Sequence, residues 1–213
     1  VHQGVMFPHT YPDTVVALDA SNGMVLWRYR YEARRSTKKM GLALHGDKVF
    51  VPTSDLHVIA LDARTGTLIW NHEITTETPQ AVRGYYQLRS APLVVGNKVI
   101  QGVTASGAPK GGFLLALDLQ TGEEVWRFNT IARPGEPGGD SWNGVPLEKR
   151  SGGSVWHQGT YDPELNLIYF GIAPTYDTGP LLQPIDKAGV TSDALYTNCT
   201  VALNAETGEL VWH

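Results

Sequence analysis

The chain has 213 residues, of which 42% are hydrophobic and 18% are charged, as in ordinary globular proteins. The formal net charge is −4 and no basic block occurs, which argues against a nucleic-acid partner. The single cysteine, Cys199, excludes an internal disulfide and a cysteine-held metal cluster, and no apolar run is long enough to span a membrane. The 23 glycines suit many tight turns, so the composition favours an all-β protein.

An eleven-residue pattern occurs four times along the chain, as in ALDARTGTLIW. Each copy has an apolar stretch, a turn sequence with Gly, and a second stretch that ends in Trp. Gly suits a turn position with positive φ, and Asp or Asn four residues earlier can accept hydrogen bonds from the backbone of the turn. We therefore predict four β-hairpins, at residues 17–27, 60–70, 116–126 and 202–212.

Another strand-like segment with its own turn precedes three of these hairpins, so each unit holds about four strands. The spacing of about 43 residues between Trp27 and Trp70 is typical of β-propeller blades with four antiparallel strands. We expect one Trp per blade to pack against the neighbouring blade. The sequence thus predicts one partial propeller domain over 1–213 with about four blades, at approximately 1–33, 40–76, 86–130 and 152–213.

Four blades fall short of the six to eight of a closed ring, and the chain starts and stops within strand patterns. We therefore expect an internal fragment of a longer protein. The first residues, VHQGVMF, lack the charged and apolar regions of a signal peptide.

The repeated frame resembles the tryptophan docking motif of alcohol dehydrogenases that depend on pyrroloquinoline quinone (PQQ), which are eight-bladed propellers. Non-catalytic propellers, such as the outer-membrane assembly scaffold lipoprotein of Gram-negative bacteria, carry similar repeats. Two further segments resemble the quinoproteins: GGSVWHQGTYDPELNLIYFG at 152–171 and TGEEVWRFNTIARPGEPGGDSW at 121–142. The resemblance covers nearly the whole chain and implies a periplasmic enzyme that oxidises alcohols or polyols and passes electrons to a cytochrome c or a quinone.

PQQ is a planar tricarboxylate quinone, so its site needs an aromatic face and groups that bind carboxylates. By resemblance, Trp156 falls at the tryptophan that forms the floor under the quinone. Thr104, Ala105 and Ser106 fall at the quinone's edge as backbone and hydroxyl donors. Arg89 falls where the family places a donor near the carboxylates, and Arg83 could compete with it. The structural alternatives are a core tryptophan, a polar turn at a blade end and a surface arginine.

The resemblance also implies Ca²⁺ or a lanthanide ion, but the expected ligands are not in place. The family's metal-binding Glu falls at Gly107, which has no ligand side chain, and its Asn ligand falls at Pro174. Asp177 is the nearest carboxylate to the second position. The metal ligands therefore stay unassigned.

The family's vicinal cysteine pair falls at Arg34 and Arg35, and the arginine that contacts the reactive quinone oxygens falls at Met40. A shift of one residue would bring Lys39 to that place as the cation. The family's catalytic base falls beyond His213, so we assign no catalytic residue and expect the chain alone to be inactive. The alternative is a non-catalytic propeller scaffold or binding protein of the bacterial envelope, and a lyase or sugar-binding propeller has no specific support.

Overall fold

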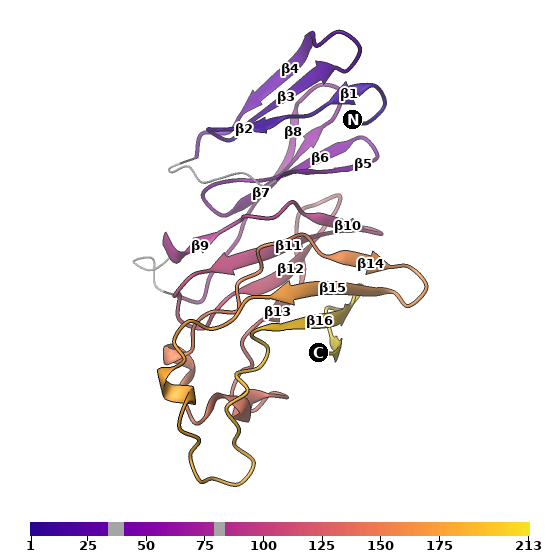
Figure 1. Cartoon of the computed structure of the whole chain (residues 1–213). Helices are drawn as coiled ribbons and strands as arrows, with labels where there is room; N and C mark the ends of the chain where they lie inside the picture. Colours follow the sequence, from indigo (N-terminus) through magenta and orange to yellow (C-terminus); the bar gives the residue numbers. More distant parts are fainter. Residues whose placement is uncertain (34–40, 79–83) are drawn as a thin grey trace.

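The computed structural model describes residues 1–33, 41–78 and 84–213. Over these ranges the strands form four antiparallel sheets, which Figure 1 shows side by side in chain order. We call these sheets blades 1 to 4. In the part of the chain described, the blades form an open stack that does not close into a ring. The structure confirms the predicted all-β, propeller-like architecture of about four blades.

Blade 1 contains β1 (Val5–Met6), β2 (His9–Thr10), β3 (Thr14–Asp19) and β4 (Val25–Arg30). Blade 2 contains β5 (Ala43–His45), β6 (Lys48–Pro52), β7 (His57–Asp62) and β8 (Leu68–Glu73). Blade 3 contains β9 (Tyr86–Gln87), β10 (Leu93–Val95), β11 (Lys98–Ala105), β12 (Phe113–Asp118) and β13 (Glu124–Asn129). Blade 4 contains β14 (Thr160–Asp162), β15 (Leu167–Ile172), β16 (Cys199–Asn204) and β17 (Leu210–Trp212).

The four repeated motifs form the last hairpin of each blade, as predicted. In each hairpin the alanine of the motif lies directly opposite the tryptophan, and a register shift follows. The turn glycines have φ between 73° and 79°, a region that other residues enter only at a cost. In blade 3 the Asp118 carboxylate accepts hydrogen bonds from the backbone N–H groups of Gln120 and Thr121, both at 2.9 Å. Local turn chemistry therefore explains these hairpins.

The motif tryptophans join neighbouring blades. The indole nitrogen of Trp70 in blade 2 donates to the carbonyl oxygen of Leu119 in blade 3, at 3.1 Å. Trp27 and Trp126 make the same bond to the blades that follow them. Trp70 is 8% exposed, whereas Trp212 in the last blade is 48% exposed. The predicted packing of one tryptophan per blade is thus confirmed at the three interfaces between the four described blades.

The core is divided between the blade interfaces. Strand β11 contributes to two apolar clusters, because successive side chains of a strand point to opposite faces. Val99 and Val103 belong to the cluster between blades 2 and 3. Ile100 belongs to the cluster between blades 3 and 4. Strand β11 therefore touches both neighbouring blades at once.

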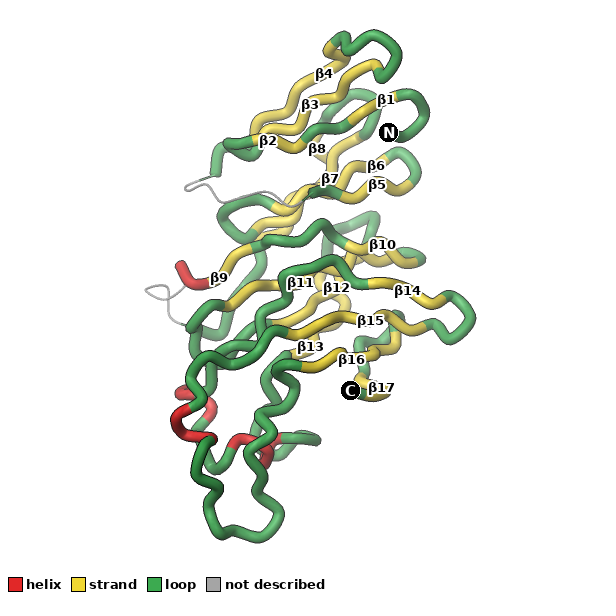
Figure 2. The backbone as a smooth tube through the Cα atoms, viewed as in Figure 1, coloured by secondary structure: helices red, strands yellow, loops and turns green. Residues whose placement is uncertain are grey.

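One side of the stack carries the long connections between blades, on the left in Figure 1. We call this side the loop face. Figure 2 shows it as loops interrupted by short helices, and the connections after β13 and β15 pack there around Ile131, Trp142 and Ala194. The short 3₁₀ helices in these connections are η2 (Gly139–Trp142), η3 (Leu147–Lys149) and η4 (Gly179–Leu181). None of the helices found in the described ranges has the length and apolar character of a membrane span.

Candidate cofactor site

The segment that carries Trp156 runs alongside the end of β11. The backbone N–H of Val155 donates to the carbonyl of Val103 at 3.3 Å, and the Thr104 hydroxyl donates to the carbonyl of Val155 at 3.1 Å. The backbone N–H of Ala105 donates to Ser154 Oγ at 2.9 Å. These three bonds fix the backbone immediately before Trp156.

Glycines allow this close approach. A Cβ atom on Gly102 would lie 2.4 Å from Cγ1 of Val155, so only glycine leaves room for that side chain. Gly153 has φ of +62°, and a Cβ atom there would lie 2.5 Å from the hydroxyl of Thr130. Gly102 and Gly153 therefore each have a packing reason in this fold.

Trp156, which precedes β14, and Arg89, which follows β9, lie together. The guanidinium carbon of Arg89 lies 5.8 Å from the centroid of the Trp156 ring, close to the outer limit of about 6 Å for a cation–π contact. Nε of Arg89 also donates to the side-chain oxygen of Gln87 at 2.6 Å. Trp156 is partly exposed, and its buried Nε1 has no hydrogen-bond partner among the described residues. The pair therefore consists of a partly exposed aromatic ring and a guanidinium over it.

The predicted edge residues divide into two kinds. Thr104 and Ala105 are buried, and the Thr104 hydroxyl and the Ala105 amide are engaged with the 154–155 backbone and side chain. In this structure these two groups hold the segment that carries Trp156 in place. Ser106 is exposed and lies at the start of the loop between β11 and β12. Lys39 lies outside the described residues.

The expected metal positions offer no ligand set. Gly107 is an exposed turn residue with φ of +72°, and both Pro174 and Asp177 are exposed. Across the described ranges, no group of three or more His, Cys, Asp or Glu side chains could hold a metal ion. The residues present fit a planar anionic quinone, but the described ones do not supply a metal site. The predicted positions Arg34, Arg35, Met40 and Arg83 lie outside the described residues.

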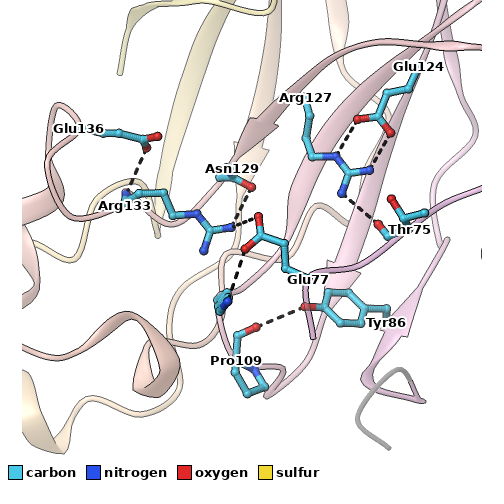
Figure 3. A network of polar contacts seen from close by, with 10 residues as sticks. Thr75, Glu77, Tyr86, Pro109, Glu124, Arg127, Asn129, Arg133 and Glu136 are labelled. Atoms are coloured by element: carbon cyan, nitrogen blue, oxygen red, sulfur yellow. Dashed lines mark hydrogen bonds and ion pairs between the residues drawn. The ribbon is translucent and has the colours of Figure 1, made fainter. Parts of the chain in front are cut away.

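A charged cluster that the sequence analysis did not identify joins the connection after β8 to blade 3 (Figure 3). Glu77 makes ion pairs with Arg133 at 3.2 Å and with Lys110 at 3.6 Å. Arg133 also donates to the side chain of Asn129 at 3.0 Å. The cavity between these residues has a volume of about 10 Å³, which holds no more than one water molecule. The cluster is therefore an ion-pair contact that links the connection after blade 2 to blade 3, and not a second ligand site.

A second contact in this region has a similar role. The Arg127 guanidinium forms two hydrogen bonds with the Glu124 carboxylate and donates to the carbonyl of Thr75 at 2.9 Å. Its central carbon also lies 4.2 Å from the centroid of the Phe113 ring. Glu77, Thr75 and these arginines are spread over many residues in unrelated local contexts, so no motif in the sequence marks them.

Comparison with known proteins agrees with the geometry. The sequence profile of the family described as "PQQ: Glucose/ethanol/alcohol dehydrogenase, beta-propeller domain" matches residues 1–213. Quinohemoprotein alcohol dehydrogenase ADH IIB of Pseudomonas putida is 36% identical to the chain, covering all of it and 32% of that relative. A europium-containing methanol dehydrogenase has a similar structure, with a TM-score of 0.83 and 27% identity over all of this chain and 40% of that one.

Another solved structure matches less well. The structure of BamB from Moraxella catarrhalis gives a TM-score of 0.52 at 20% identity, covering 98% of this chain and 57% of that one, which shows the fold alone. The chain spans about a third of the length of the quinohemoprotein relatives that it matches. Because the family profile matches over its whole length, the chain belongs to the β-propeller family of PQQ-dependent alcohol dehydrogenases.

Proposed function

We propose that the chain provides the quinone floor and part of the rim of a PQQ-dependent enzyme that oxidises an alcohol or polyol. The observation that carries this proposal is the guanidinium carbon of Arg89, which lies over the partly exposed ring of Trp156 at 5.8 Å from its centroid. A planar polyanion gains stacking energy on such a ring and charge-assisted hydrogen bonds from the guanidinium.

Each site residue has a separate role in the proposal. Trp156 stacks under the quinone, and Arg89 binds its carboxylates through a planar donor group. Ser106 offers a hydroxyl at the edge, while Thr104 and Ala105 act indirectly by fixing the floor segment. Lys39, which a shift of one residue brings to the place of the family's arginine, would supply a cation to the quinone oxygens.

When bound, PQQ supplies the hydride acceptor for alcohol oxidation. The residues of this chain bind and orient it, and no catalytic base is assigned. We propose a cytochrome c or a quinone as the next electron acceptor, because relatives are named as quinohemoproteins and as a hydroxylase acting with cytochrome c. By resemblance we propose a periplasmic location, and Ca²⁺ or a lanthanide as the metal, with no ligand assigned.

The test is a PQQ titration of the purified protein, with Ca²⁺ or a lanthanide present, followed by quenching of tryptophan fluorescence. We expect saturable quenching that is lost in Trp156→Ala. Trp212→Ala is the matched control, since Trp212 is an exposed tryptophan on β17 and should leave binding unchanged. Absence of saturable quenching in the unmodified protein with either metal would contradict the proposal.

A non-catalytic envelope scaffold is the second candidate. The missing metal ligands at Gly107 and Pro174 favour it. It gives no reason for the Trp156–Arg89 pair, and so the enzyme is the preferred function. An unmodified protein that fails to bind PQQ would make the scaffold the leading candidate.

A further inference from the structure

Gln101 is a polar residue in an apolar position. It lies in β11 on the same face as Val99 and Val103, which belong to the apolar cluster between blades 2 and 3, and it is fully buried. Burying an amide is costly unless its groups are hydrogen-bonded, and a Leu or Met side chain would avoid this cost. The Oε1 atom of Gln101 has no hydrogen-bond partner among the described residues, so the contacts of Nε2 are the ones that offset this cost.

Those contacts join Gln101 to the segment that carries Arg89. Nε2 of Gln101 donates to Ser90 Oγ at 3.2 Å, to the Ser90 carbonyl at 3.3 Å and to the Gly102 carbonyl at 2.8 Å. Ser90 is itself buried and directly follows Arg89. Gln101 thus ties the backbone next to Arg89 to β11.

The opposite face of β11 holds the segment of Trp156. Val155 fills the space beside Gly102 and accepts the hydrogen bond of Thr104. Neighbouring residues of one strand therefore fix the two halves of the site, Gln101 on the Arg89 side and Gly102 on the Trp156 side. A side-chain bond from Gln158 to the carbonyl of Pro92, at 2.7 Å, links the same two segments directly.

We propose that Gln101 is a positioning residue that sets the place of the Arg89 guanidinium relative to the Trp156 ring, and through it the affinity for the carboxylates of the quinone. This inference rests on the proposed function. Gln101 touches neither the ring nor the ligand in this role, and it acts only through Ser90 and Arg89. A residue that acts through another should lose its effect when that other residue is removed.

A double-mutant cycle tests this dependence. The dissociation constant for PQQ is measured by fluorescence titration in the unmodified protein, Gln101→Met, Arg89→Met and the double variant. We expect Gln101→Met to weaken binding about tenfold when Arg89 is present and less than about twofold in Arg89→Met, because contacting residues in one network couple. Ile59→Val, a conservative change in the fully buried core of blade 2, is the stability control and should leave binding unchanged.

Ser90→Ala gives a second route to the same test, because it removes the hydroxyl partner and leaves Gln101 in place. It should also lose its effect in the Arg89→Met background. Equal weakening of PQQ binding in both backgrounds, or no weakening by either variant, would overturn the role of Gln101 while leaving the proposed function intact. An unmodified protein that does not bind PQQ would overturn both.

Discussion

The ring of Trp70 lies against Gly122 of the following blade so closely that a Cβ atom on this glycine would be 2.7 Å from the ring. The same relation recurs between Trp27 and Gly66, and between Trp126 and Gly208. The motif glycine therefore has two roles. It adopts positive φ in its own hairpin, and its lack of a side chain lets the tryptophan ring of the preceding blade pack against it. This double demand explains why the turn and the tryptophan recur together.

Replacing Gly122 by Ala should lower the free energy of unfolding by about 3 kcal/mol, because φ of +76° is unfavourable for Ala and the added methyl overlaps Trp70. Urea unfolding measures the loss. Gly46→Ala is the matched control, since Gly46 also has positive φ but has open space around its Cβ position, and it should cost only about 1 kcal/mol. Equal losses in the two variants would show that the Trp70 contact adds nothing.

Asp118 should make the stability of blade 3 depend on pH. Backbone hydrogen bonds from Thr121 and Gln120 lower the pKa of its carboxyl group. The ionised form therefore stabilises the folded state above the ordinary pKa of about 4, and this stabilisation is lost as the pH falls through the lower folded pKa.

We expect Asp118→Ala to cost about 1 kcal/mol at neutral pH, by analogy with the loss of a capping side chain, and to flatten the acid limb of the stability curve. Asp118→Asn should keep most of the stability at pH 7, because Asn204 accepts the same hydrogen bonds in blade 4. Denaturation followed between neutral and acid pH compares the three proteins. An unchanged acid limb in Asp118→Ala would show that the carboxylate does not contribute.

The ion pairs of Glu77 should make a modest, salt-sensitive contribution to the free energy of unfolding. Its partner Arg133 is 13% exposed in its side chain, but Glu77 itself is 50% exposed, so solvent screens the pair. We expect Glu77→Gln to lower the free energy of unfolding by less than about 1 kcal/mol at low salt and by almost nothing at high salt. Glu32→Gln removes a fully surface ion pair with Arg30 and should have no measurable effect. If Glu77→Gln still lowers the free energy of unfolding at high salt, then Glu77 stabilises the protein by packing and not by its charge.

Cys199 should react slowly with thiol reagents in the folded protein. Burial raises the pKa of its thiol, and Sγ donates to the carbonyl of Tyr196 at 3.0 Å. The thiolate is the reactive form, so the labelling rate should rise with pH through a midpoint above that of an unfolded cysteine. The same reaction in urea provides the control and should be fast near the ordinary cysteine pKa. Equal rates in both states would contradict the burial of the thiol.

Much of this fold could be predicted from the chain alone, because its determinants are local. Ala60, Asp62, Gly66 and Trp70 lie within one eleven-residue frame, and turn chemistry makes that frame a hairpin wherever it occurs. Four copies of the frame then predict four similar sheets. The tryptophan of each copy lies on the face of its blade, so that a neighbouring blade is needed to cover it. The resemblance to quinoproteins added Trp156 and Arg89 as separate candidates.

Tertiary structure alone decided how Trp156 and Arg89 lie relative to each other. Arg89 meets Trp156 because β11 binds one segment on each face, through Gln101 and Gly102, and no local pattern encodes that arrangement. Tertiary structure also placed the Thr104 hydroxyl within hydrogen-bond distance of the carbonyl of Val155, so that Thr104 supports the segment that carries Trp156. Hairpins follow from neighbours in sequence, whereas a site depends on contacts between segments that only the packing of blades brings together.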